Sequence, residues 1–398
     1  MNRNIRKNTS KPPAIRSRIF PALFKLVLFI VVLSLVHLFA AGPSTAAIKE
    51  SNKNQYVWSG VERIVAVGDL HGDYESFILI LKGTGVVDDK LHWKAGKTHL
   101  VQIGDIMDRG DGARDIYDLI MRLEEEAGQA GGYVHMLLGN HEEANLTGIA
   151  LDFEGYVTLG QFLSFLPEKF KEKKEKEFLR KRKIDSKDQM DPGLYKDFMK
   201  FWQDILDDAR INSTSSARAA YTRNFIETYG KWIMDHNAVI KINKIIFVHG
   251  GISERYSEWS MEKINERLQK ELKEFSRAAI GGTIPATQRL ILYMPDGPLW
   301  HRVFAMNNDP GLDQELGRVL QNLGAEQMII AHTPLIAGDD IISRFNQRVW
   351  VIDTGISEYY RNSGGLIRAL IINDGDFSVW KPDSDIEDQV SEKQGGAL

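Results

Sequence analysis

Four short clusters along the chain combine glycine with aspartate, asparagine or histidine, and a fifth site is a lone histidine; these polar residue types bind hard and borderline divalent metals. In chain order they are GDLHG at residues 68–72, GDIMDRG at 104–110, GNHE at 139–142, HGG at 249–251 and a histidine at 332. A pair of ions held close together needs about six protein ligands, one of them bridging. The clusters supply that set as Asp69, His71, Asp105, Asn140, His249 and His332.

Each cluster taken alone has a simpler explanation. Gly-Asp after a strand is often a turn, asparagine is often a helix cap, and a histidine beside an apolar run is more often a hydrogen-bonded core residue than a ligand. Five clusters in one order, each at the end of a predicted strand, favour a metal site over these explanations. The chain has no cysteine, which excludes thiolate ligands and a cysteine nucleophile.

The elements that must position these clusters are short β-branched runs that read as buried strands. They are residues 63–67, 98–103, 133–138, 244–248, 328–330 and 348–352. Helical periodicity between the first runs, at 74–82 and 114–126, gives an alternation of strand and helix and predicts an α/β fold. Loops beyond strand ends are where a rigid sheet presents chemistry, and most of these loops carry Asp, His or Asn.

Two long segments interrupt this alternation. Residues 151–236 and 254–290 show helical character and no convincing strand. The first contains a run from Glu168 to Asp188 with ten basic and six acidic residues. We interpret this run as a solvated helix with Glu and Lys pairs four residues apart, in preference to a partner-binding patch.

The order of the clusters resembles the metallophosphoesterase superfamily, and within it the phosphoprotein phosphatase family. The spacing and the stretch from Asp296 to Arg302 (DGPLWHR) look most like the Shewanella-like protein phosphatases. The resemblance covers roughly residues 60–375 and implies a calcineurin-like β-sandwich flanked by helices, with the two long segments as helical inserts. A catalytic domain is therefore expected over residues 60–380, followed by a polar tail at 381–398.

The resemblance also implies a role for each site residue. Asp69, His71, His249 and His332 would hold two ions, Asp105 would bridge them, and Asn140 would bind the second ion and contact phosphate. His141 would act as general acid, oriented and kept cationic by Asp108. Arg109 would bind phosphate through a bidentate guanidinium.

The resemblance also suggests site roles for three further residues, whose local sequence matches the family less closely. Arg302 is the candidate for a second phosphate-binding arginine, with a structural salt bridge as the alternative, because the residues after Leu299 and Trp300 depart from the family pattern. Tyr359 and Tyr360 resemble a loop at the mouth of the site, as substrate contacts or as wall.

The first 47 residues read as a targeting segment. They carry seven basic groups and no acidic ones, and an uncharged apolar run at 26–41 precedes small residues ending at Ala47. We expect export with cleavage near Ala46 or Ala47, with membrane anchoring by residues 26–41 as the alternative. Either reading predicts that the folded domain is periplasmic or secreted.

Since the whole chain has a formal charge of −4, the residues after position 47 carry −11, which argues against a nucleic-acid partner.

Together these features predict an exported phosphomonoesterase with two divalent ions of Mn, Fe or Zn. Its expected substrate is a phosphorylated protein or peptide, with phosphotyrosine first and phosphoserine or phosphothreonine second, a preference that rests on the resemblance alone. One alternative is hydrolysis of a dinucleoside polyphosphate or another small phosphoester. An alternative of another class is an exported binding protein without activity, against which the complete ligand set argues.

Overall fold

The structure is a computed structural model that describes residues 55–281 and 290–383. The predicted targeting segment, residues 1–47, lies outside the described residues, as do residues 384–398 of the predicted tail. Among the helices that are described, none is both long and apolar enough to cross a membrane.

One sheet has five strands in the order β11-β10-β2-β3-β4. The central strands β2, β3 and β4 are parallel, and β10 lies antiparallel to both β2 and β11. The strands are β2 (Arg63–Val67), β3 (His99–Gln102), β4 (Tyr133–Met136), β10 (Ala369–Asn373) and β11 (Asp376–Trp380). Parallel strands of this kind bring their carboxyl ends to one edge of the sheet.

The second sheet has six strands in the order β1-β5-β6-β7-β9-β8. Here β6, β7 and β9 are parallel, so a second set of carboxyl ends meets at one edge. The strands are β1 (Val57–Trp58), β5 (Val239–Ile242), β6 (Ile245–Val248), β7 (Gln327–Ile330), β8 (Ile342–Arg344) and β9 (Val349–Val351).

The two sheets pack face to face. Ile64 and Ala66 of β2 share one apolar cluster with Ile240 of β5 and Phe247 of β6. The alternate residues of β2, such as Val65, belong to a second cluster that includes the flanking helices. Because successive side chains of a strand point to opposite faces, β2 is covered on both sides. This arrangement confirms the predicted β-sandwich flanked by helices.

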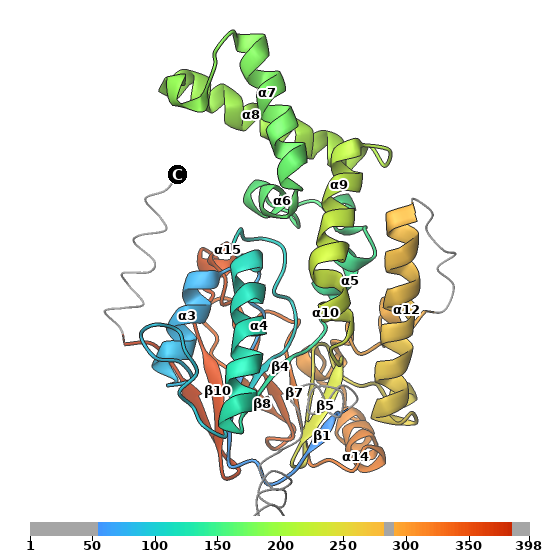
Figure 1. Ribbon diagram of the computed structural model, residues 1–398. Coiled ribbons are helices and arrows are strands. Elements are labelled where there is room, and N and C mark those ends of the chain that lie inside the picture. The colour runs from blue at the N-terminus through green and yellow to red at the C-terminus, as the bar shows by residue number, and fades with distance from the viewer. Residues whose placement is uncertain (1–54, 282–289, 384–398) are drawn as a thin grey trace, which may run out of the picture. The chain divides into compact units, whose positions relative to one another are not determined.

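Helices α3 (Tyr74–Gly83) and α4 (Ala113–Ala130) lie beside the five-stranded sheet (Figure 1). Next to the six-stranded sheet lie α12 (Met261–Gly281) and α14 (Leu312–Asn322). The short elements after the strands are α5 (Asn140–Leu146), η1 (Ala150–Asp152), α11 (Glu254–Ser257), η4 (Ile291–Tyr293), α13 (Val303–Met306) and α15 (Glu358–Arg361).

The segment 151–236 folds into helices. They are α6 (Leu159–Phe165), α7 (Glu168–Arg182), η2 (Lys187–Gln189), α8 (Pro192–Ile211), α9 (Ser216–Phe225), η3 (Ile226–Gly230) and α10 (Lys231–Met234). On α7, Phe178 is buried while ion pairs such as Glu177 with Lys181 line the surface. Such pairs at four-residue spacing contribute about 0.3–0.5 kcal/mol each. The charged run is therefore mostly a solvated helix, as predicted.

All six predicted strands are present, with ends that differ by one or two residues. The sequence did not predict β1, β5, β8, β10 and β11. Strand β5 pairs antiparallel with β6, β8 with β9, and β10 with β11. Turns of two residues join β5 to β6 and β10 to β11. Asp374 and Gly375, which join β10 to β11, are a hairpin signal that could have identified that pair.

Candidate metal centre and catalytic site

The six predicted metal ligands come from loops that follow β2, β3, β4, β6 and β7. All six side chains are buried, at 4% exposure or less: Asp69, His71, Asp105, Asn140, His249 and His332. Ligand atoms of Asp105, His249 and His332 lie within 4.8 Å of one another. Asp69 lies 3.9 Å from His71 and 3.7 Å from His249. The parallel strands of both sheets thus bring all six together.

Backbone carbonyls fix the orientation of two histidine rings. His71 Nδ1 lies 2.9 Å from the Met107 oxygen, and His249 Nδ1 lies 2.8 Å from the Ile103 oxygen. A ring that donates Nδ1–H to a carbonyl turns the lone pair of Nε2 in the opposite direction. Metal-binding histidines are commonly held by such a bond. Both rings therefore point their Nε2 lone pairs into the cluster.

The six predicted ligands place more hydrogen-bond acceptors than donors close together. His249 Nε2 lies 3.0 Å from Asn140 Oδ1 and 3.2 Å from Asp105 Oδ2, and buried His332 Nε2 has no hydrogen-bond partner. Burial, reinforced by the neighbouring Asp353 and Asp105 carboxylates, raises the pKa of Asp69 well above its usual value. A divalent cation offers these acceptors a partner and offsets their charge, so the residues present fit a metal centre.

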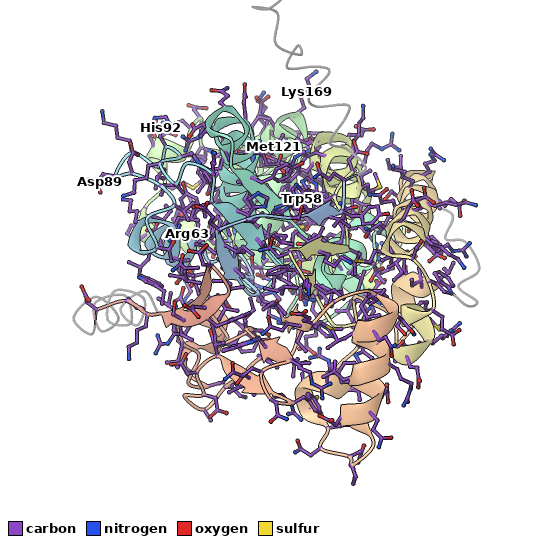
Figure 2. The ribbon with its side chains drawn as sticks, turned by 90° about the horizontal axis from the view of Figure 1, so that it is seen from below. Trp58, Arg63, Asp89, His92, Met121 and Lys169 are labelled. Atoms are coloured by element: carbon purple, nitrogen blue, oxygen red, sulfur yellow. The ribbon has the colours of Figure 1, made fainter. Side chains whose placement is uncertain are left out.

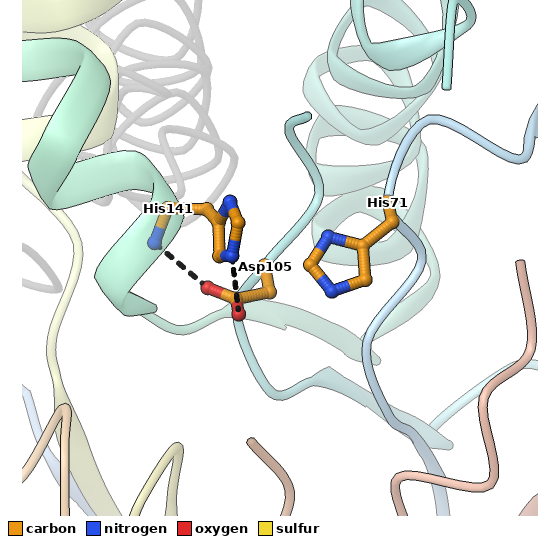
Figure 3. Close-up of side chains that lie close together, drawn as sticks. All are labelled: His71, Asp105 and His141. Atoms are coloured by element: carbon orange, nitrogen blue, oxygen red, sulfur yellow. Dashed lines mark hydrogen bonds and ion pairs between the residues drawn. The ribbon is translucent and has the colours of Figure 1, made fainter. Parts of the chain in front are cut away.

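A second group consists of His71, Asp105 and His141, whose ligand atoms also lie within 4.8 Å of one another (Figure 3). Asp105 is the member common to both groups. The backbone N–H of His141 donates to Asp105 Oδ1 at 2.9 Å, and His141 Nε2 lies 3.8 Å from Asp105 Oδ2. His141 was predicted as general acid and not as a ligand. Its Nδ1 is held by Asp108, which leaves Nε2 facing the cluster.

Asp108 is buried and receives three side-chain hydrogen bonds. They come from His141 Nδ1 at 2.7 Å, Asn145 Nδ2 at 3.0 Å and Gln161 Nε2 at 2.7 Å. The oxygen of the Gln161 amide accepts from the Asp108 backbone N–H at 2.7 Å. Tyr221 of α9 in turn donates to Asn145 Oδ1 at 2.9 Å. Helices α6 and α9 of the 151–236 segment thus supply part of the support for Asp108.

Arg109 lies beside His71 under a group of tyrosines. Its Nη1 lies 2.6 Å from His71 Nε2 and donates to the Tyr360 hydroxyl. The guanidinium carbon lies 5.3–5.7 Å from the ring centroids of Tyr156, Tyr359 and Tyr360, within the range of cation–π contact. Tyr359 is 56% exposed. The two tyrosines predicted at the mouth therefore adjoin the predicted phosphate-binding arginine.

Arg302 also reaches the cluster, through backbone and hydroxyl contacts. Its Nη1 donates to the His332 carbonyl at 2.6 Å and to Thr333 Oγ1 at 3.1 Å. Arg302 thus braces the loop that carries His332, and it forms no ion pair with the described residues.

Backbone strain is concentrated in these loops. Five site residues have left-handed φ angles: His71 (43°), Asp105 (55°), Asp108 (67°), Arg109 (67°) and His332 (65°). Strained conformations of this kind persist where the surrounding structure fixes them, and they cluster at functional sites. Gly104 has a φ of +86°, and a Cβ there would lie 2.6 Å from the Gly139 nitrogen, so only glycine fits beside Asp105.

Sequence reasoning missed Glu142, although it lies in the GNHE cluster. Its carboxylate accepts from the backbone N–H groups of Asp105 at 2.8 Å, Ile106 at 2.9 Å and Gly139 at 3.0 Å. Glu142 therefore fixes the loop that follows β3 relative to the loop that follows β4. Its position three residues after Gly139 matches the last position of a capping box, a signal that could have identified it.

Asp353 and Tyr156 were also missed. Asp353 follows β9, is buried, and lies close enough to Asp69 for its carboxylate to raise the pKa of Asp69. Tyr156 lies in the loop before α6, and its ring stacks on His141 with centroids 4.1 Å apart. No motif surrounds Tyr156, so only the tertiary structure places it at the site. Asp353 directly follows the predicted strand 348–352 and precedes Thr354 and Gly355, a signal that could have identified it.

Comparison with known proteins gives the same family as the site. Residues 62–335 match the family described as calcineurin-like phosphoesterase. The chain is 30% identical to Shewanella-like protein phosphatase 2 of Arabidopsis thaliana over 302 residues, 75% of this chain and 72% of that protein. It is 25% identical to Shewanella-like protein phosphatase 1 of Plasmodium berghei (strain Anka), over 75% of this chain and 68% of that protein.

The fold has a solved counterpart in the cold-active protein-tyrosine phosphatase of a psychrophilic Shewanella species. The TM-score is 0.55 at 22% identity, over 82% of this chain and 84% of that chain. Two sheets flanked by helices, the buried Asp, His and Asn cluster and these matches lead to one assignment. The chain belongs to the calcineurin-like phosphoesterase family and, within it, to the Shewanella-like phosphatases, and it is a metal-dependent phosphoester hydrolase.

Proposed function

We propose that the chain is a binuclear phosphomonoesterase that removes phosphate from proteins or peptides. The observation that carries the proposal is that Asp105 belongs to both groups of possible ligands, one with His71 and one with His249 and His332. A carboxylate shared in this way is suited to bridge two ions. Asp69 and Asn140 complete the set of six, and a mixture of imidazole, carboxylate and amide suits Mn, Fe or Zn.

When bound, divalent ions at such a site lower the pKa of water for attack on phosphorus and offset charge on the phosphate oxygens. Arg109, together with Arg302 and Asn140, would hold the phosphate in line for that attack. As the bond from phosphorus to the leaving oxygen breaks, the proton on His141 Nε2 passes to that oxygen. The attacking water supplies the proton that restores His141. Asp108 keeps the ring oriented through Nδ1.

A protein or peptide substrate is supported by the relatives of the chain, which are named as protein phosphatases. Phosphotyrosine is the first candidate because the solved structure with the same fold is a protein-tyrosine phosphatase. The tyrosines beside Arg109 offer aromatic surface at the mouth of the site. Phosphoserine and phosphothreonine peptides are the second candidates.

The test uses the purified chain stripped of metal and assayed against phosphotyrosine, phosphoserine and phosphothreonine peptides with Mn, Zn, Fe or no addition. We expect turnover that metal restores and that Asp105→Asn abolishes. Asp204→Asn, at an exposed residue of α8 that pairs with exposed Lys200, is the matched control. No turnover with any metal, despite bound ions, would contradict the proposal, and a strong preference for a dinucleoside polyphosphate would replace its substrate.

We also propose that residues 1–47 direct export, on the basis of their basic start, apolar run and small residues. Mass spectrometry of the mature protein from its own cells distinguishes the outcomes. A new N-terminus near residue 47 would indicate cleavage, and an intact N-terminus in the membrane fraction would indicate anchoring. An intact chain in the cytosol would contradict export.

A further inference from the structure

Tyr156 is the side chain that covers the predicted general acid. It lies between η1 and α6, and its ring stacks on the His141 ring at a centroid distance of 4.1 Å and an interplanar angle of 26°. His141 is 1% exposed. The exposed ring of Phe153 stacks on Tyr156 in turn, at 4.8 Å and 29°. The three rings form a stack from the buried cluster toward the surface.

The backbone of Tyr156 also contacts the predicted phosphate-binding residue. The Arg109 N–H donates to the Tyr156 carbonyl at 2.7 Å, where Arg109 has a φ of 67°. The Arg109 guanidinium carbon lies 5.7 Å from the Tyr156 ring. One loop residue therefore contacts both His141 and Arg109, which follow different strands.

The contacts of His141 leave one motion to be restrained. Its Nδ1 is bonded to Asp108, which fixes one atom of the imidazole but still permits the ring to tilt about that bond. A flat ring packed face to face against the imidazole opposes this tilt, because aromatic pairs prefer an offset stack and the loss of contact costs dispersion energy. The His71 ring meets the imidazole edge to face at 4.6 Å, so the direction of Nε2 depends on Tyr156 as well as on Asp108 and His71.

We propose that Tyr156 is a positioning residue whose ring aligns His141 Nε2 with the leaving oxygen of the substrate. The inference rests on the proposed function, since it takes His141 as the acid. It predicts an effect that depends on the leaving group. Proton transfer matters most for an ester whose leaving group is strongly basic, such as phenyl phosphate. It matters less for 4-nitrophenyl phosphate, which has a more stable leaving anion.

The experiment compares these two esters with the Mn-loaded full-length chain. Tyr156→Leu removes the flat face but keeps apolar bulk and the backbone carbonyl that binds Arg109. We expect kcat on phenyl phosphate to fall at least tenfold, since general acid catalysis contributes about 10²–10⁴-fold in rate. On 4-nitrophenyl phosphate we expect a fall of about threefold or less, and KM for both esters within about threefold. Tyr156→Phe should restore the ratio of the two rates.

Phe153→Leu is the matched control, because Phe153 contacts Tyr156 and lies farther from the cluster; it should leave the ratio unchanged. Equal losses on both esters in Tyr156→Leu would overturn the inference, as would no loss on either or failure of Tyr156→Phe to restore the ratio. Should Tyr156→Leu not fold, Tyr156→Met is measured against the same outcomes. Melting temperature and bound metal are measured for every variant.

His141→Asn, measured in parallel, separates the inference from the proposed function. If His141→Asn discriminates between the esters and Tyr156→Leu does not, only the inference is wrong. If His141→Asn does not discriminate, the acid role in the proposed function is wrong, and the inference falls with it.

Discussion

His141 and Asp108 form a buried pair in which Nδ1 and Oδ2 lie 2.7 Å apart, with side-chain exposures of 2% and 0%. The bond of His141 Nδ1 to Asp108 orients the imidazole ring, and His141 Nε2 faces Asp105. Asp108 is itself held by Asn145 and Gln161. The pair therefore has the arrangement that a positioned general acid requires.

Asp108→Asn is expected to lower kcat on phenyl phosphate by about 10²-fold or more, because an amide in place of the carboxylate no longer stabilises the imidazolium or fixes its tautomer. Bound metal should stay unchanged, since Asp108 is not among the six predicted ligands. Steady-state kinetics and metal analysis check both expectations. Because the two residues act as a unit, the double variant with His141→Asn should lose no more than His141→Asn alone. Additive losses would show that the two act independently.

Gln161→Leu is expected to destabilise the fold and to slow catalysis. The change removes the donor to Asp108 Oδ1 and the acceptor for the Asp108 N–H, which leaves buried polar groups unsatisfied at a cost of about 1–3 kcal/mol in the free energy of unfolding. Urea denaturation measures that free energy. Gln203→Leu is the control, because its amide donates to Asp207 on the surface of α8. Equal stabilities of the two variants would contradict the importance of this buried bond.

Metal removal is expected to lower the melting temperature. Ligand that binds only the folded state stabilises it by about 2.7 kcal/mol at a hundredfold excess over Kd. We expect Mn to raise the melting temperature of the stripped wild-type chain and to have little effect on Asp105→Asn, which loses the residue common to both ligand groups. Differential scanning calorimetry with parallel metal analysis checks this. An equal rise in both proteins would mean that Asp105 does not take part in binding.

The stability of the fold is expected to depend on pH through His99. Burial lowers the pKa of His99 to about 4, and His135 shares a hydrogen bond with it under the ring of Trp58, which is labelled in Figure 2. The folded pKa lies below the usual value of about 6.5, so the neutral form is favoured on folding. The contribution of neutral His99 to the free energy of unfolding is fully present above pH 6.5. It falls by about 1.4 kcal/mol for each pH unit as the pH decreases toward 4.

Urea denaturation at pH 7.5 and pH 5.0 measures this loss. His99→Gln should lose about 2 kcal/mol less than the wild type between these values, because the variant no longer has the buried imidazole of His99 to protonate. His92→Gln is the control, because the His92 side chain is exposed, as Figure 2 shows. If His99→Gln and the wild type lose stability equally, His99 does not titrate as predicted.

Arg302→Lys distinguishes a phosphate contact from a structural one. Arg302 Nη1 alone donates to both the His332 carbonyl and Thr333 Oγ1, bonds that a lysine ammonium can also make, but a lysine lacks the planar fork that binds phosphate through two nitrogens. If Arg302 binds phosphate, the inhibition constant of inorganic phosphate should rise about tenfold or more, as expected for Arg109→Lys, since a hydrogen bond to a charged group contributes about 1.5–3 kcal/mol. A normal inhibition constant with weaker metal retention would instead assign Arg302 to the support of His332.

Much of the fold was predictable from strands that end in polar clusters. The runs that became β2, β3, β4, β6, β7 and β9 were identified because each is short, β-branched and followed by a turn. The sandwich itself came from the resemblance. Strands β10 and β5 were not predicted, because a run of four or five apolar residues alone does not distinguish a strand from a helix. Asp374 and Gly375, which join β10 to β11, are a two-residue hairpin signal that could have identified that pair.

The sequence by itself determined which residue types stand at the strand ends, and so the chemistry of Asp69, Asp105 and His249 and the family to which the chain belongs. A glycine beside every predicted ligand except His332 was part of that local signal. Only the tertiary structure decided which distant side chains support these residues. Gln161 reaches Asp108, Tyr156 covers His141, and Asp353 adjoins Asp69 because the packing of helices and sheets brings them there. Such contacts depend on chain segments far apart in sequence, and no local spacing records them.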